Sequence, residues 1–188
     1  MSDNVETGKV APTIYFAYGS NLWMDQMNRR CPEHKYFGTG VLHDWWGSPR
    51  ARSICCSTHR FHRCWIICQK GYANVIPSTG DQVYGFLYEL SPKDEEFLDG
   101  YEDVPRNYVK KTIPIQLITS SGNGDSETAM QRSIDALVYV DIVNTSRDAP
   151  KTEYIYRINM AVKDAIEMGI SQSYVDKYIR PSIPPESE

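Results

Sequence analysis

Near the N-terminal end of this chain stands the stretch Tyr15-Phe16-Ala17-Tyr18-Gly19-Ser20-Asn21-Leu22. Residues 13–18 carry apolar side chains on both faces of an expected strand, which is typical of a central, buried strand. The small residues that follow predict a turn, and residues 23–30 are expected to form a helix that ends before Pro32. Backbone N–H groups at such a turn can bind a carboxylate or an oxyanion, although Gly, Ser and Asn also form turns that bind nothing.

The composition is that of an ordinary globular domain. The chain has 188 residues, of which 41% are hydrophobic and 23% are charged, and this length predicts one domain. A formal net charge of −4 gives no attraction to nucleic acid or to anionic membranes. No stretch reaches the roughly 18 apolar residues of a membrane span. We therefore expect one domain over residues 12–180, flexible tails at 1–11 and 181–188, and no nucleic-acid or membrane partner.

The cysteine count and residues 1–10 indicate in which cellular compartment the protein is expected. Five cysteines are an odd number in a chain that is large enough to fold without disulfides, and this favours free thiols in a reducing compartment. Residues 1–10 contain no apolar run behind a basic start. We expect a cytoplasmic protein. The 13 tyrosines suit a pocket for a small polar ligand and suit strand surfaces equally well.

Strand patterns and helix patterns alternate along the chain. Strands are expected at residues 13–18, 35–46, 64–68, 72–76, 83–90, 107–118 and 134–142, and helices at 23–30, 92–99, 154–166 and 171–179. Gly38 and Gly40 predict a kink or bulge in the second strand. Residues 64–68 and 72–76 predict a hairpin. Because most strands are consecutive, the pattern predicts an α+β domain with a mixed sheet or a barrel.

The helix at residues 92–99 has clear start and stop signals. Ser91 is the expected N-cap, Pro92 the first helical residue, and Gly100 the residue that ends the helix. Six acids fall between residues 94 and 103, and most are expected on a solvated face. Glu102 lies where the chain turns back toward the sheet. A carboxyl group drawn into an aromatic cavity there would have a raised pKa and could move protons, but the residues alone do not distinguish Glu102 from its acidic neighbours.

Cysteines and histidines gather in residues 55–68 and raise the question of zinc. They are Cys55, Cys56, His59, His62, Cys64 and Cys68. Their spacing is that of no zinc ribbon or finger, and in a strand Cys64 and Cys68 would face the core together with Ile66. The arginines of the same region lack a nucleic-acid-binding motif, and close Cys and His pairs also arise by chance. We expect no metal and no cofactor.

The stretch 15–22 resembles the signature of the γ-glutamylcyclotransferase family, which includes AIG2-like proteins. Further landmarks follow in the family's order over about residues 13–180. They are Gly80-Asp81-Gln82-Val83-Tyr84-Gly85, then Leu98-Asp99-Gly100-Tyr101-Glu102 with Tyr108, and finally Tyr154 with Met160 and Ala161. The chain departs from the family pattern in a longer segment between Trp46 and Cys64 and after Ala161. These departures leave the choice of substrate open.

The resemblance implies a mixed-sheet β-barrel with flanking helices and an enzyme that releases 5-oxoproline from small γ-glutamyl compounds. It implies a catalytic general acid/base role for Glu102, and substrate binding by Tyr15, Phe16, Ala17, Tyr18, Gly19, Ser20, Asn21, Leu22 and Tyr154. The alternatives are a cyclotransferase for γ-glutamyl amines or thiol conjugates and a non-catalytic binding module, and the chain could be a monomer or a homodimer. The enzyme hypothesis requires Glu102 to share one cavity with the Gly19–Ser20 turn.

Overall fold

Five strands close into a barrel in the computed structural model, which describes residues 11–43, 62–78, 81–118 and 132–186. In order around the barrel they are β1 (Thr13–Ala17), β5 (Val83–Leu90), β2 (Lys35–Leu42), β6 (Val109–Ile118) and β7 (Ser133–Val140). A separate two-stranded sheet consists of β3 (His62–Ile67) and β4 (Ala73–Ser78). The helical elements are η1 (Ser20–Leu22), α1 (Met24–Arg30), α2 (Pro92–Tyr101), α3 (Thr152–Glu167), α4 (Gln172–Tyr174) and η3 (Val175–Ile179).

Strand β1 has a neighbouring strand on each edge, as its apolar faces predict. It pairs antiparallel with β5, from Thr13 opposite Leu90 to Ala17 opposite Phe86. On its other side it runs parallel to β7, and this pairing closes the barrel. Residues Tyr15 to Ala17 are buried because a barrel strand has neighbours on both edges and side chains on a packed inner and outer face. The predicted mixed-sheet barrel is confirmed.

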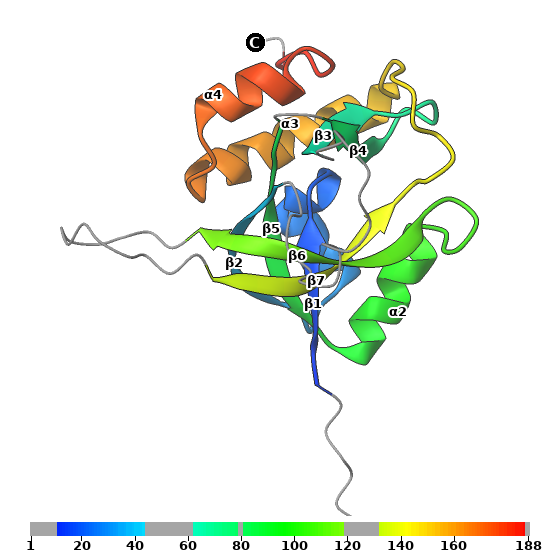
Figure 1. Cartoon of the computed structure of the whole chain (residues 1–188), viewed down its shortest axis with the longest axis vertical. Helices are drawn as coiled ribbons and strands as arrows, with labels where there is room; N and C mark the ends of the chain where they lie inside the picture. Colours follow the sequence, from blue (N-terminus) through cyan, green and yellow to red (C-terminus); the bar gives the residue numbers. More distant parts are fainter. Residues whose placement is uncertain (1–10, 44–61, 79–80, 119–131, 187–188) are drawn as a thin grey trace, which may run out of the picture.

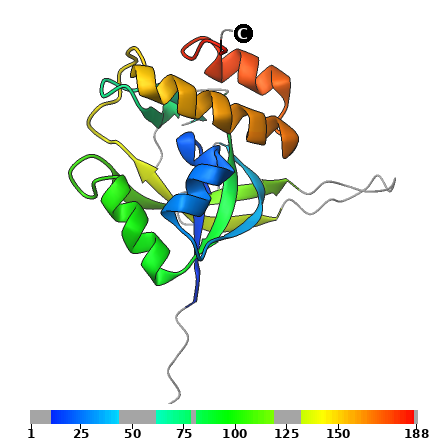
Figure 2. The same ribbon diagram turned by 180° about the vertical axis from the view of Figure 1, so that it is seen from behind.

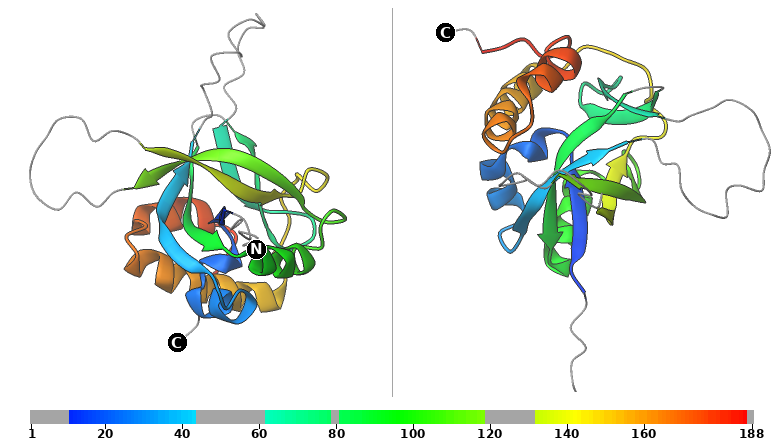
Figure 3. Two further views of the ribbon diagram at one scale, coloured as in Figure 1. Left: turned by 90° about the horizontal axis from the view of Figure 1, so that it is seen from below. Right: turned by 60° about the vertical axis from the view of Figure 1, so that its left-hand side comes forward.

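The helices lie around the barrel at different positions (Figure 1). Helices α3 and α4 lie together near the β3–β4 hairpin, whereas α2 lies apart, beside β6 and β7. Helix α1 lies between them in the view from behind (Figure 2). From below, β6 and β7 cross one side of the barrel, and α1, α3 and α4 occupy the other (Figure 3). In the described part of the chain, no helix is long and apolar enough to cross a membrane.

The second strand carries the predicted bulge. The β2–β5 register shifts between Tyr36 and Gly38, and Gly38 has φ 156°, a value that favours glycine. Strand β2 ends at Leu42. The remainder of the expected strand, with Trp45 and Trp46, lies outside the described residues.

The predicted hairpin of β3 and β4 is confirmed, and it contacts the loop after β1. Cys64, Ile66 and Cys68 are buried, as expected of core residues. Trp65 is also buried, and its Nε1 donates a hydrogen bond to the Tyr18 carbonyl oxygen at 3.0 Å. The hairpin is therefore attached to the start of the Gly19–Asn21 loop.

Helix α2 ends later than the sequence predicts. It continues through Gly100 to Tyr101, and Glu102 is its C-cap. The left-handed residue that turns the chain is Asp103, with φ 51°, a conformation that Asp adopts more easily than most residues. Its carboxylate accepts a hydrogen bond from Asn107 Nδ2 at 2.8 Å. The expected stop at Gly100 is wrong because Asp103 supplies the turn instead.

The chain remains packed beyond residue 180, although the sequence predicts a flexible tail at residues 181–188. Ile183 is fully buried. Asn159 Nδ2 donates to the Pro184 carbonyl oxygen at 3.0 Å, and Arg180 Nη1 donates to Asn159 Oδ1 at 2.6 Å. The segment as far as Pro184 is therefore packed against the rest of the protein. Ile183 provides the apolar contact, and the hydrogen bonds to Asn159 attach the segment to α3.

Candidate active site

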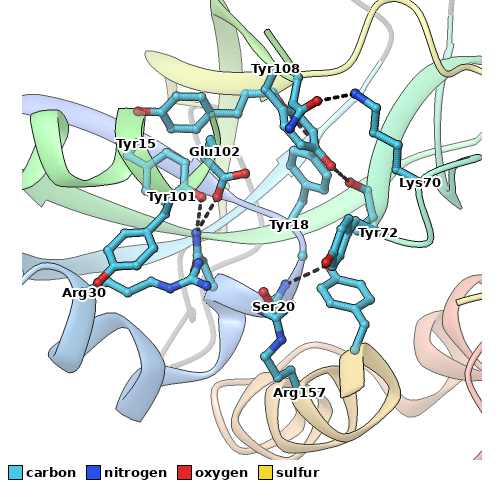
Figure 4. A pocket seen from close by; sticks show the side chains of 16 residues that line it. Tyr15, Tyr18, Ser20, Arg30, Lys70, Tyr72, Tyr101, Glu102, Tyr108 and Arg157 are labelled. Atoms are coloured by element: carbon cyan, nitrogen blue, oxygen red, sulfur yellow. Dashed lines mark hydrogen bonds between the residues drawn. The ribbon is translucent and has the colours of Figure 1, made fainter. Parts of the chain in front are cut away.

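A cavity of about 340 Å³ lies where β1, α2, the β3–β4 turn and α3 meet (Figure 4). Its described lining residues are Tyr15, Tyr18, Gly19, Ser20, Asn21, Arg30, Lys70, Tyr72, Ala73, Tyr101, Glu102, Asn107, Tyr108, Tyr139, Tyr154 and Arg157. Glu102 and the Gly19–Ser20 turn thus share one cavity, as the enzyme hypothesis requires.

The loop after β1 forms one wall of the cavity and is hydrogen-bonded to helix α3 and strand β5. The Ser20 backbone N–H donates to the Tyr154 hydroxyl oxygen at 3.2 Å, and the Tyr88 hydroxyl donates to the Asn21 carbonyl oxygen at 3.2 Å. A Cβ on Gly19 would lie 2.9 Å from the Tyr154 hydroxyl and 3.2 Å from the Ala73 methyl group. Glycine is therefore required for this close approach, and the loop backbone lies directly against the tyrosine of α3.

The Asn21 side chain links the loop to Glu102. Its Nδ2 donates to Tyr15 Oη at 2.9 Å and to Glu102 Oε1 at 3.3 Å. Its Oδ1 accepts from Gln26 Nε2 at 2.8 Å and from Arg30 Nη1 at 2.9 Å. Because two donors meet the amide oxygen, the NH₂ group is oriented toward the Glu102 carboxylate.

Glu102 is a partly buried carboxyl group at the end of α2. Burial raises its pKa, and the charge of Arg30, the hydrogen bond from Asn21 and the charge of Arg157 limit this rise. A carboxyl group with a raised pKa exchanges protons closer to neutral pH than an exposed glutamate does. Glu102 is therefore suited to accept and return a proton in this cavity.

Tyrosines form much of the remaining wall, and burial raises the pKa of several of them. Burial raises the pKa of Tyr15 and of Tyr18 well above the ordinary value. Burial raises the pKa of Tyr154 to about 12, and the hydrogen bonds from the backbone N–H groups of Ala73 and Ser20 lower it in part. Because Tyr154 accepts these N–H groups, its own O–H can donate to a ligand.

The cavity also contains three cationic side chains. Arg30 packs over the Tyr101 ring, with Cζ 4.6 Å from the ring centroid. Lys70 donates to Asn107 and lies 3.5 Å from the Asp141 carboxylate. Arg157 Cζ lies 4.9 Å from the centroid of the Tyr154 ring. The cavity can therefore hold anionic groups.

Most of the residues expected at the site are brought together, and three are not. Tyr15, Tyr18, Gly19, Ser20, Asn21, Glu102 and Tyr154 line the cavity. Phe16, Ala17 and Leu22 are instead buried in the hydrophobic core. Phe16 points to the opposite face of β1 from Tyr15, the Ala17 side chain is a single methyl group, and Leu22, the last residue of η1, is buried in the core. Their expected contact with substrate is therefore not supported by this geometry.

Several lining residues were missed by the sequence analysis. Arg157 follows Tyr154 by three residues, so helical spacing could have placed both on one face of α3. Arg30, Lys70 and Tyr139 come from a helix end, a hairpin turn and a barrel strand. No sequence spacing relates these three to Glu102, because only the barrel brings them together.

Part of the Cys and His cluster of residues 55–68 lies outside the described residues. Cys55, Cys56 and His59 lie outside the described residues, as do the arginines between residues 50 and 60. Among the described residues, no group of three or more His, Cys, Asp or Glu side chains could hold a metal ion. The cavity chemistry that the structure describes consists of one carboxyl group, phenols, amides and cations.

Comparison with known proteins relates this geometry to one family. The family model described as gamma-glutamyl cyclotransferase, AIG2-like, matches residues 15–155. The gamma-glutamylcyclotransferase of Bos taurus is 26% identical over 167 residues, covering 87% of this chain and 76% of the bovine protein. Gamma-glutamylaminecyclotransferase A of Danio rerio is 39% identical over 54 residues, covering 29% of this chain and 32% of that protein.

A solved structure described as a gamma-glutamyl cyclotransferase has the same fold. It superposes with a TM-score of 0.62 at 21% identity, and the match covers 94% of this chain and 90% of the other. The likeness therefore extends over nearly the whole fold, from the barrel to the helices.

Proposed function

Because this chain belongs to the gamma-glutamyl cyclotransferase, AIG2-like family, we propose that it releases 5-oxoproline from γ-glutamyl amino acids or peptides. The observation that carries the proposal is the position of Glu102, whose Oε1 lies 3.3 Å from Asn21 Nδ2 in the cavity of the Gly19–Asn21 loop. A proton-transferring carboxyl group and a loop that can bind an anion are then present in one small cavity. Intramolecular lactam formation needs both.

In the proposed reaction the α-amine of the substrate attacks its own γ-carbonyl carbon. A C–N bond forms to close the five-membered lactam, and the C–N bond to the departing amine breaks. The attacking nitrogen enters as an ammonium group and ends as a lactam N–H, so it gives up two protons. The departing nitrogen takes up the same number and leaves as an ammonium ion. Glu102 is positioned to carry protons from one nitrogen to the other, and water is not consumed.

The Gly19–Asn21 loop has the complementary task of holding the glutamyl half. Backbone N–H groups there can bind the α-carboxylate or the oxyanion that forms at the γ-carbonyl. The Tyr154 hydroxyl lies against this loop and can donate its proton to the same group. Folding the substrate so that its amine meets its carbonyl contributes to the rate through proximity.

The test is replacement of Glu102 by glutamine, with release of 5-oxoproline from γ-glutamyl-alanine as the assay. We expect Glu102→Gln to lower kcat/KM by at least ~100-fold, since general acid–base catalysis is typically worth that much. Glu96→Gln is the matched control, because Glu96 is an exposed acid of the same helix. No product from the wild-type protein, or full activity in a folded Glu102→Gln variant, would contradict the proposal.

A second candidate substrate class is the γ-glutamyl amines. The local likeness to the zebrafish gamma-glutamylaminecyclotransferase A favours it, and the chemistry at Glu102 would be the same. Release of 5-oxoproline from γ-glutamyl amines, but not from γ-glutamyl-alanine, would replace the first candidate by this one.

A further inference from the structure

The charges that line the cavity do not balance. Among the described lining residues, Arg30, Lys70 and Arg157 are cationic, and Glu102 is the acidic one. On the proposed function, the glutamyl half of a substrate brings one carboxylate and one ammonium group and is neutral. Asp141 and Glu153, the partners of Lys70 and Arg157, do not line the cavity, so a carboxylate on the departing amine could bind a lining cation in competition with one of these acids.

The three cations differ in how firmly they are held. Arg30 is hydrogen-bonded to Asn21, and Lys70 faces Asp141, whose side chain is fully buried. Arg157 pairs with Glu153 of the same helix through Nε at 2.9 Å and Nη2 at 3.2 Å, and the Arg157 side chain is 21% and the Glu153 side chain 56% exposed. Because the Glu153 carboxylate is exposed, water can replace Arg157 as its partner, so the pair costs less to break than a buried one. Arg157 can therefore exchange Glu153 for a carboxylate of the substrate at small cost.

Arg157 also lies at a suitable place for the departing half. Its guanidinium carbon is 4.9 Å from the Tyr154 ring centroid and 5.8 Å from that of Tyr72. Tyr154 in turn contacts the Ser20 backbone, so one tyrosine ring separates the guanidinium from the loop. Figure 4 shows Glu102 and Arg157 on opposite sides of the cavity. A substrate whose glutamyl half meets Glu102 and the loop would extend toward Arg157.

We propose that Arg157 binds the carboxylate of the departing amino acid, so that the site prefers γ-glutamyl amino acids to γ-glutamyl amines of equal size. The guanidinium fork matches a carboxylate in two parallel hydrogen bonds. Packing over the Tyr72 and Tyr154 rings holds the guanidinium plane in place. This inference rests on the proposed function and names its substrate class.

The test compares two substrates that differ by one carboxylate, γ-glutamyl-alanine and γ-glutamyl-ethylamide. For the wild-type protein, kcat/KM should be at least ~10-fold higher with γ-glutamyl-alanine than with γ-glutamyl-ethylamide. The ethylamide has no carboxylate and therefore cannot form the hydrogen-bonded charge pair with Arg157. Arg157→Met should lower kcat/KM for the alanine compound about 10- to 100-fold more than for the ethylamide, because the effect of the lost charge on the pKa of Glu102 is shared by both substrates. Methionine keeps apolar packing on the two rings, and retained ethylamide turnover shows that the variant is folded.

Two further variants complete the experiment. Arg157→Lys should restore part of the preference, since it keeps the charge without the fork. Lys151→Met is the matched control: Lys151 Nζ lies 4.5 Å from the Tyr72 centroid, but Lys151 is not among the lining residues. The control should leave the substrate ratio unchanged.

The outcomes separate the inference from the function on which it rests. Equal turnover of both substrates by the wild-type protein would overturn the inference and leave the proposed function standing. Equal losses for both substrates in Arg157→Met would also overturn it and would place Arg157 at the glutamyl half. If neither substrate released 5-oxoproline, the proposed function itself would be contradicted.

Discussion

At the scale of single residues, Asn21 connects the two halves of the cavity. Its amide nitrogen meets both Tyr15 and Glu102, and its oxygen is held by Gln26 and Arg30. An asparagine donates with one end and accepts with the other, so the orientation of this amide decides whether Glu102 faces a donor or an acceptor. The surrounding residues select the donor, which stabilises the charged carboxylate against the effect of burial.

The balance at Glu102 predicts how stability depends on pH. Its folded-state pKa is raised, so its stabilising contribution is complete below the unfolded-state pKa of about 4.3 and is lost as pH rises through the folded-state pKa. We expect Glu102→Gln to have a higher Tm than the wild-type protein at pH 8. The difference should shrink toward pH 4.

Thermal unfolding of both proteins between pH 4 and pH 8 measures this. Glu96→Gln should show no such pH-dependent difference, since Glu96 is exposed. A lower Tm of Glu102→Gln at pH 8 would mean that the attraction of Arg30 and Asn21 outweighs the cost of burial.

At the scale of elements, α2 places Glu102 because both of its ends are defined locally. Its start is the predicted one: Ser91 Oγ accepts from the Asp94 backbone N–H at 3.1 Å, and Pro92 occupies the first helical position. Its end is set by the left-handed turn at Asp103. The helix therefore begins and ends at residues that aim Glu102 at the cavity.

The N-cap of α2 gives a prediction for stability. Ser91→Ala removes the acceptor of the Asp94 N–H and should lower the free energy of unfolding by about 1 kcal/mol. Ser91→Asp, which restores an acceptor, should recover most of that loss. Urea denaturation of the three proteins measures the effect. If Ser91→Ala and Ser91→Asp were equally destabilised, the hydrogen bond of the cap would not be the cause.

At the scale of the whole molecule, the C-terminal segment supports the helix that forms one wall of the cavity. Helix α3 carries Tyr154 and Arg157 on its cavity face, and its Asn159 is hydrogen-bonded to Arg180 and Pro184. Ile183 is fully buried in the same region. The segment after η3 thus stabilises the position of α3 against the barrel.

Replacement of Ile183 tests this packing. Ile183→Ala should lower the free energy of unfolding by about 2–5 kcal/mol, the usual range for a fully buried isoleucine. Ile166→Ala is the matched control: Ile166 is 40% exposed, and the loss there should be much smaller. Chemical denaturation measures both. Similar losses in the two variants would show that Ile183 is not part of the packed core in solution.

Local signals in the sequence predict much of the secondary structure of this protein. Apolar side chains on both faces of residues 13–18 predicted a central strand, Gly38 predicted the bulge, and Ser91 with Pro92 predicted the start of α2. These signals are readable because they depend on neighbouring residues. The stop of α2 was misplaced at Gly100, since a glycine can remain helical when a later residue supplies the turn. The importance of Glu102 came from a resemblance and not from its own surroundings in the sequence.

Which polar side chains meet depends on how the barrel and the helices pack together. Asn21 and Glu102 are 81 residues apart in the chain, and Ser20 and Tyr154 are 134 residues apart. Their contacts follow from the closure of β1 against β5 and β7 and from the packing of α3 on the loop. Arg157 acquires its place beside two tyrosine rings in the same way. The stretch 15–22 defines a strand and a turn, but the cavity exists because a closed barrel brings distant segments to the end of that strand.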